Sequence, residues 1–310
     1  MTKNFKHEIK RRIKNKLIER KNFFRSPFSI AIGVILLVYA ISLLIPVVWG
    51  FITSVKSNFD FLYNRLGMPE EWHFDNYSVA FEYFYVIIPK GSGQAIFYLW
   101  DMLGVSLFYC CGKALLGAFV PMLAGYLSVA FPNVVSRTIT NIVMITMVLP
   151  IYGGGGTTLV IYQQLGLYNN LVPYVIFTSF GFGGMNYLIW RANFKATSIT
   201  FAEAARIDGA GEIAIMFKIQ FPLVMKMFMT FALLGFIGTW QDYGTSLIVL
   251  PSYPTVAYGL FLYSGNGETA VSSVPMILSG AMIMLLPLLG LFICFHKQLI
   301  GNISFGGLKE

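Results

Sequence analysis

Four consecutive residues, Trp240-Gln241-Asp242-Tyr243, have the side chains that carbohydrate recognition uses. An aromatic face stacks on sugar C–H bonds, while an amide and a carboxylate hydrogen-bond to hydroxyl groups. A structural interpretation is equally consistent with the residue types: Trp240 packs in a core and Asp242 pairs with a neighbouring helix. The residues alone leave both interpretations open.

Lys113 is a second charged residue well inside an apolar run. Such a charge is costly in a membrane and faces a bundle interior or a water-filled cavity. At 1.5 Å per residue, Lys113 lies about 16 Å and Asp242 about 12 Å from the predicted outer ends of their helices. The matching depths predict that these two side chains face each other. The alternative is that each contacts water or a partner subunit separately.

The residue types give little support for a metal site, a disulfide framework, an ATP site or an enzyme active site. The three histidines and three cysteines have no metal-ligand or disulfide spacing, and the chain lacks a Gly-x-x-x-x-Gly-Lys-Ser/Thr loop for ATP. An integral-membrane enzyme needs titratable groups that converge near one leaflet, and the apolar runs offer Lys113 and Asp242 alone. We therefore expect neither a metal nor a cofactor on this chain.

The composition predicts an all-α integral membrane protein. Of 310 residues, 56% are hydrophobic and 12% are charged, and the mean hydropathy is +0.67. A helix that spans hydrocarbon takes roughly 20 apolar residues. We predict six transmembrane helices, at 28–52, 102–130, 137–165, 171–193, 224–250 and 274–296.

The net charge of +8 comes largely from an N-terminal arm, residues 1–27. A basic segment before the first span favours a cytoplasmic position and contact with anionic lipid headgroups. No surface that could recognise nucleic-acid bases follows it in the sequence, so nucleic-acid binding is not expected. Both termini and residues 194–223 are therefore predicted to be cytoplasmic. The run 28–52 is too long for a signal peptide. The basic residues of the arm are Lys3, Lys6, Lys10, Arg11, Arg12, Lys14, Lys16, Arg20, Lys21 and Arg25.

Residues 200–222 form a mostly polar island between apolar runs. Thr200 and Glu203 have the spacing of a capping box, which predicts the start of a short helix. Gly209 predicts its end, and Glu212 predicts the start of a second helix, which Pro222 limits. Two short helices should therefore meet at a bend that carries few bulky side chains.

This island resembles the EAA loop of ATP-binding-cassette (ABC) importer permeases. The matching residues are Glu203-Ala204-Ala205, Gly209, Ile219 and Phe221-Pro222, with Phe221 in place of the usual Leu. In that family the loop is the cytoplasmic coupling helix, which docks in a cleft of the ATPase subunit. The alternative is an ordinary turn between two spans. The resemblance assigns ATPase coupling to Glu203, Ala204, Ala205, Arg206, Asp208, Gly209, Ala210, Gly211 and Pro222.

Further resemblances point to the carbohydrate-uptake class 1 permeases, the maltose-transporter type. Residues 240–243 are similar to their Trp-Asn-(Asp/Glu)-(Phe/Tyr) motif, with Gln241 in place of Asn. Residues 72–77 resemble their Asn-Tyr segment, and the tail 297–310 resembles their Gly-Gly-x-Lys terminus. The likeness runs from about residue 70 to the C-terminus. Ser198 departs from it, because the family commonly has Pro before the coupling helix.

Two more segments have open interpretations. The extracytoplasmic segment 53–101 is rich in aromatic residues, which favours either docking of a solute-binding protein or an interfacial aromatic belt. The third predicted span contains Pro150 and then Gly153, Gly154, Gly155 and Gly156. These glycines indicate either an unwound segment beside the substrate pathway or close helix packing.

Together the resemblances imply the ABC type I importer permease fold, with a five-helix core at 102–296. They imply a permease subunit in a bacterial inner membrane, paired with a second permease and served by a solute-binding protein and a dimeric ATPase that uses ATP and Mg. They imply a sugar or oligosaccharide substrate, carried along a pathway that includes Lys113, Gly153–Gly156 and Trp240–Tyr243. The alternatives are a non-sugar solute, a membrane scaffold and an integral-membrane enzyme.

Overall fold

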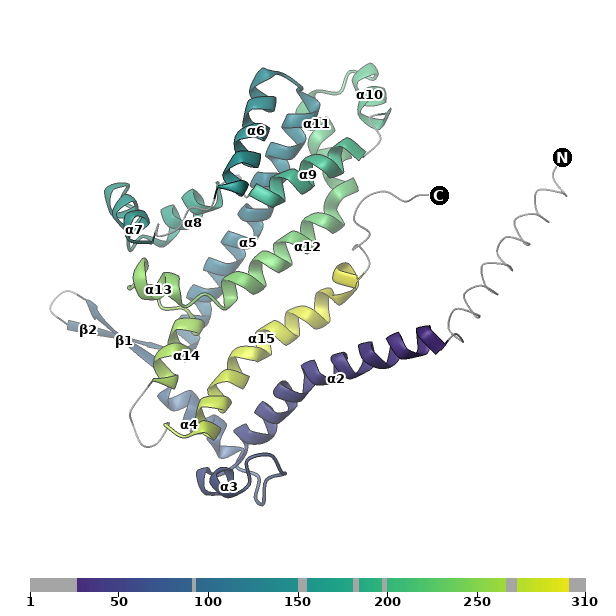
Figure 1. Ribbon diagram of the computed structural model, residues 1–310. Coiled ribbons are helices and arrows are strands. Elements are labelled where there is room, and N and C mark those ends of the chain that lie inside the picture. Colours follow the sequence, from purple (N-terminus) through teal and green to yellow (C-terminus); the bar gives the residue numbers. More distant parts are fainter. Residues whose placement is uncertain are drawn as a thin grey trace. The chain divides into compact units, whose positions relative to one another are not determined.

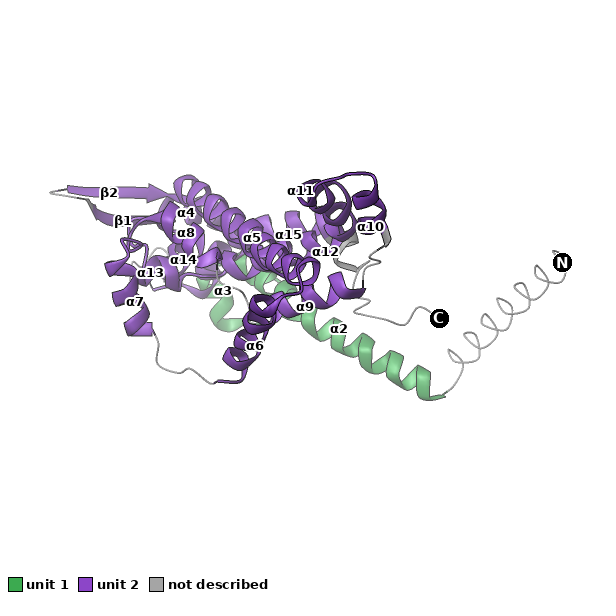
Figure 2. Ribbon diagram, turned by 90° about the horizontal axis from the view of Figure 1, so that it is seen from above, with its two compact units in different colours: residues 1–74 green, residues 75–310 purple. Residues whose placement is uncertain are grey.

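The computed structural model describes residues 27–90, 93–149, 155–180, 184–196, 200–265 and 272–300. Within these ranges the chain is helical apart from turns and one β-hairpin (Figure 1). It divides into two compact units, residues 1–74 and 75–310, which Figure 2 colours separately. Four helices in the described ranges are long and apolar enough to cross a membrane.

The described part of the first unit is one long helix and a small cap. Helix α2 (Pro27–Ser54) has 28 residues, about 42 Å at 1.5 Å per residue, and its apolar side chains are almost all exposed. After it, α3 (Asn58–Tyr63) begins at Ser57, whose hydroxyl accepts from the backbone N–H of Asp60. Trp49 Nε1 donates to Arg65 O across 2.9 Å. The polar residues after α2 therefore fold back onto the end of this helix.

Helix α5 (Leu99–Ala130) is the central element of the second unit. It packs against α8 (Leu171–Ser179), α9 (Gly184–Ala196) and α12 (Phe221–Trp240), and α12 also packs against α15 (Val274–Ile300). Figure 1 shows α5, α12 and α15 as the long rods of this unit. Three buried clusters follow α5 from one end to the other, around Met102, Tyr109 and Met122. One helix thereby organises the whole described core.

The third and fourth predicted spans are not confirmed as single helices. The region of 137–165 forms α6 (Val134–Val148) and α7 (Gly155–Gln164), and the region of 171–193 forms α8 and α9. Leu149 is extended, with φ −73° and ψ 115°. The residue before a proline is biased toward this conformation, so Pro150 explains why α6 ends there.

The fifth predicted span is displaced toward the N-terminus. Helix α11 (Glu212–Ile215), the π-helical turn η1 (Met216–Gln220) and α12 form one continuous run that ends at Trp240. Pro222 therefore does not end a helix; it is the second residue of α12, directly after the π-helical turn η1. Two short helices follow, α13 (Gly244–Ile248) and α14 (Val256–Ser264).

The all-α prediction missed a β-hairpin. After α4 (Asp75–Tyr83), strands β1 (Tyr85–Lys90) and β2 (Gly93–Tyr98) pair antiparallel. Val86 and Ile88 are buried, whereas Ile87 between them is half exposed and opposite Ile96. This alternation of β-branched residues is the period of a strand with one buried face.

Candidate functional site

Helix α10 (Thr200–Ile207) and α11 meet at the predicted bend. Gly209 N donates to Arg206 O across 3.0 Å, and Ala210 N donates to Ala205 O across 2.9 Å. These two bonds, with φ +80° at Gly209, form a Schellman motif in which glycine occupies the left-handed position. The predicted helix stop at Gly209 is confirmed.

The space around Gly209 is open. A Cβ built at this position would meet no heavy atom of the chain within 4 Å. The need for glycine within this chain therefore comes from its positive φ, since no side chain of this chain crowds the position.

An ion pair closes the bend between α10 and α11. Arg206 Nε donates to Glu212 Oε1 across 2.6 Å, and Arg206 Nη2 donates to Glu212 Oε2 across 3.2 Å. The hydrogen bond from Arg206 to Glu212 raises the pKa of the arginine above its ordinary value. Tyr126 Oη of α5 lies 3.5 Å from Glu212 Oε2. The sequence pointed to Arg206 but not to its partner Glu212. The two residues are six apart in the sequence, and their side chains meet only when the chain bends between α10 and α11.

The outer surface of the bend is apolar. Phe201 is 59% exposed, Ile207 86% and Ile213 78%. Ala202, in contrast, is buried against the body. Glu203 is exposed, and among described residues nothing hydrogen-bonds to its carboxylate. The side chain of Thr200 lies outside the described residues, so the capping box remains a prediction.

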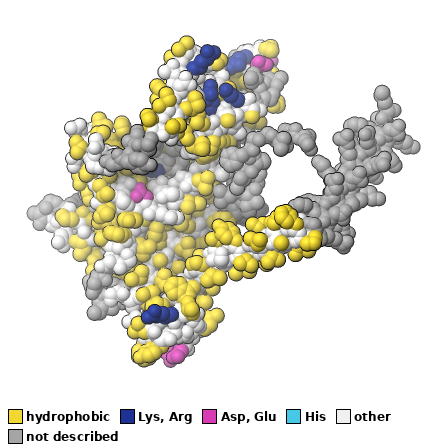
Figure 3. Space-filling view, viewed as in Figure 1, with side chains coloured by type: hydrophobic (Ala, Val, Ile, Leu, Met, Phe, Trp, Pro, Cys, Tyr) yellow, Lys and Arg dark blue, Asp and Glu magenta, His cyan; other side chains and the backbone are white. Residues whose placement is uncertain are grey.

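Basic side chains gather at the end of the second unit that carries α10, as Figure 3 shows. Arg191 and Lys195 belong to α9, and Lys218 belongs to η1. This end therefore presents cations around an exposed apolar surface.

The predicted ion pair between Lys113 and Asp242 is wrong. Lys113 Nζ donates to Thr178 Oγ1 across 2.8 Å and lies 5.8 Å from the ring centroid of Tyr174. No ion pair within 4.0 Å involves Lys113 in the ranges that the structure describes. The two charges do lie within electrostatic range of each other. The helix of Asp242 ends at Trp240, however, and the carboxylate lies in a turn where other groups bind it.

Asp242 accepts three hydrogen bonds from two residues, Thr245 in this turn and Tyr109 on α5. It accepts from Thr245 N across 3.0 Å and from Thr245 Oγ1 across 2.5 Å, both in the first turn of α13. Tyr109 Oη donates across 3.1 Å to Oδ2, the oxygen that also accepts from the Thr245 hydroxyl. The carboxylate is thereby satisfied without a cation.

Tyrosines connect the two charged groups. The rings of Tyr109 and Tyr174 lie 6.5 Å apart, and those of Tyr162 and Tyr174 lie 5.4 Å apart. We call these three tyrosines, with Lys113, Thr178, Asp242 and Thr245, the tyrosine cluster. The sequence prediction did not include these tyrosines. Their spacing could have indicated them, because Tyr109 lies one helical turn before Lys113 and Tyr174 lies one helical turn before Thr178.

The four residues 240–243 separate in space. Trp240 is 2% exposed, packs on Phe236 and donates from Nε1 to Met284 O across 3.2 Å. Tyr243 stacks on Phe261 with ring centroids 4.7 Å apart, and Gln241 is exposed. In this conformation Trp240 is a packing residue, and Asp242 alone belongs to the tyrosine cluster.

The glycine run is partly described. Gly153 and Gly154 lie outside the described residues, while Gly155 and Gly156 begin α7. A Cβ at either of these two would meet no heavy atom within 4 Å, so they make no close helix contact in this chain. In the described ranges, no group of three His, Cys, Asp or Glu side chains has the geometry of a metal site.

Comparisons with known proteins agree on a class. Residues 117–297, more than half of the chain, match the model of the family described as "Binding-protein-dependent transport system inner membrane component".

Several curated relatives carry related descriptions. A probable ABC transporter permease protein of Bacillus subtilis, YurM, is 24% identical over 90% of this chain and 88% of its own length. The arabinooligosaccharides transport system permease protein AraQ of B. subtilis is 24% identical over 92% of this chain and 97% of its own length. The maltodextrin transport system permease protein MdxG of the same organism is 32% identical over 45% of this chain and 51% of its own length.

Proposed function

We propose a transport function for this chain, which belongs to the family of binding-protein-dependent transport system inner membrane components. It is the permease subunit of an ABC importer that carries a sugar or an oligosaccharide across a bacterial inner membrane. The names of relatives that match nearly the whole chain, or about half of it, support the carbohydrate class. The four apolar helices support a multi-pass membrane protein.

The bend at Gly209 is the observation that supports coupling most directly. Two short helices fixed by the Schellman motif and by the Arg206–Glu212 pair present Phe201, Ile207 and Ile213 outward. Large exposed apolar groups at one rigid projection are typical of a docking surface. We assign this surface to the cleft of a separate ATPase subunit, which binds ATP and Mg.

The movement of this bend drives alternating access. When ATP closes the ATPase dimer, its clefts displace the coupling helices of two permease subunits. The pathway between the permeases then opens outward and receives sugar from a solute-binding protein. The basic side chains near α10 support a cytoplasmic position for this end, and hence for both termini.

The tyrosine cluster is our candidate for the part of the substrate pathway on this chain. Its aromatic rings offer faces to sugar C–H bonds, while Lys113 and Asp242 hydrogen-bond to hydroxyl groups. Lys113 and Thr178 are partly exposed, so this chain alone does not cover them.

Reconstitution tests the proposal. The chain is assembled in proteoliposomes with the second permease and the ATPase encoded beside it, and solute-binding protein, labelled maltodextrins or arabinooligosaccharides, and ATP are supplied. We expect ATP-dependent uptake of one of these sugars. Uptake of amino acids or ions instead would replace the carbohydrate assignment, and ATPase binding without any uptake would indicate a scaffold.

A further inference from the structure

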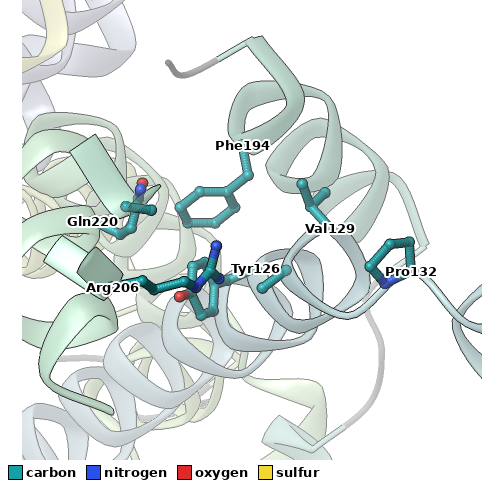
Figure 4. A pocket seen from close by; sticks show the side chains of 8 residues that line it. Tyr126, Val129, Pro132, Phe194, Arg206 and Gln220 are labelled. Carbon is teal, nitrogen blue, oxygen red and sulfur yellow. The ribbon is translucent and has the colours of Figure 1, made fainter. Parts of the chain in front are cut away.

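A pocket of about 200 Å³ lies between α10 and the body of the second unit (Figure 4). It is formed where the end of α5 and its following turn meet α9, α10 and η1. The bend between α10 and α11, which we call the coupling bend, therefore covers one side of this pocket. The lining residues are Tyr126, Val129, Ala130, Pro132, Phe194, Ala202, Arg206 and Gln220.

Most of the wall of the pocket is apolar. Val129 and Pro132 lie on one side of the pocket in Figure 4, with the rings of Phe194 and Tyr126 toward the middle. These two rings form an edge-to-face pair with centroids 5.5 Å apart. A volume near 200 Å³ accommodates about one six-membered ring with a small substituent, since a cavity of about 150 Å³ holds benzene.

Gln220 supplies the polar side of the pocket. Its side chain is 5% exposed, and the structure gives its amide no hydrogen bond among the described residues. Figure 4 shows this side chain on the same side of the pocket as Arg206. Because this amide lines the pocket, a ligand group in the pocket can hydrogen-bond to it. An amide both donates and accepts, and the matching group does the same.

The charge of the ligand follows from the Arg206–Glu212 pair. Arg206 lines the pocket, but its Nε and Nη2 donate to the carboxylate of Glu212. An anion would meet this carboxylate beside the guanidinium, and a cation would meet the guanidinium. The pocket therefore favours an uncharged molecule.

We propose that the pocket beneath the coupling bend binds a small uncharged molecule with one planar ring and one amide-like group, which hydrogen-bonds to Gln220. Such a ligand contacts α10 through Ala202 and Arg206, and contacts the body through Phe194. Its binding fixes the bend to the body and lowers the sugar-stimulated ATPase rate. This consequence rests on the proposed function, whereas the binding itself does not.

Benzamide is the probe, and the full transporter complex in detergent is the sample. We expect saturation-transfer NMR to show saturable millimolar binding of benzamide, and Gln220→Leu to weaken it at least tenfold. Gln164→Leu, on exposed α7, is the matched control and should bind as the unmodified chain does. Unchanged affinity in Gln220→Leu, or no binding to the unmodified chain, would overturn the proposal. So would tighter binding of benzoate, benzylammonium or glucose.

A second variant tests the same pocket from the other wall. Ala202→Leu adds bulk from α10 and keeps Gln220, so it should abolish benzamide binding even if Gln220→Leu fails to fold. Persistent binding in Ala202→Leu would place the ligand elsewhere. If the complex binds benzamide but never transports sugar, ligand binding in the pocket is supported and the proposed transport function is refuted.

Discussion

Substitutions of Gly209 can distinguish the effect of backbone conformation from the effect of side-chain size at the bend between α10 and α11. The residue has φ +80°, and open space surrounds the position of a Cβ. An L-residue in the left-handed conformation costs about 1–2 kcal/mol. This free energy lowers the population of the Schellman turn about 5- to 30-fold relative to its alternatives. Val costs more, because a β-branched residue at positive φ is an outlier, while Asn tolerates this region.

The series Gly209→Asn, Gly209→Ala and Gly209→Val should therefore lose coupling in that order. We expect the Val variant to insert and assemble with its partners but to lose sugar-stimulated ATP hydrolysis and uptake. The Asn variant should retain most of both activities. The assay is labelled-sugar uptake and phosphate release in proteoliposomes, with co-purification of the ATPase as the control for assembly.

Two results would refute this reasoning in different ways. Normal uptake by Gly209→Val would remove the coupling assignment of the bend. Equal losses in Gly209→Asn and Gly209→Val, with the complex intact, would show that side-chain bulk against the ATPase matters and that the positive φ does not.

Other predictions concern charges and hydrogen bonds. Glu203→Gln should impair uptake nearly as much as Glu203→Ala, because the exposed carboxylate is free to meet a cation of the ATPase; unimpaired uptake by the Gln variant would reduce Glu203 to a helix cap. Tyr109→Phe removes a hydrogen bond to a carboxylate and should cost about 1.5–3 kcal/mol in thermal unfolding of the complex, and an unchanged midpoint would contradict the bond. Lys113→Met and Asp242→Leu should couple by about 0.5–1 kcal/mol in the double variant, since the two groups lie within electrostatic range and share the tyrosine cluster without a direct ion pair; strictly additive losses would contradict this coupling.

Local features of the sequence determined the bend at Gly209. Small residues, a glycine at the helix end and an acidic residue after it specify two helices and a Schellman turn without distant contacts. The same holds for α2, α5 and α15, whose long apolar runs specify membrane helices. Pro150 is also visible in the sequence, and the extended residue before it ends α6, so 137–165 does not form one helix.

The tertiary structure alone decided the partners of the charged groups. Lys113 pairs with a threonine 65 residues away, and Tyr109 donates to Asp242 across 133 residues. Counting residues along a helix gives the depth of a side chain but not the direction in which it points, nor the neighbour it meets. Apolar residues continue past Trp240, and only the structure shows that the helix ends at Trp240, whose indole donates to α15. The pocket beside Gln220 likewise exists because four separate segments meet there, and no local pattern specifies such a meeting.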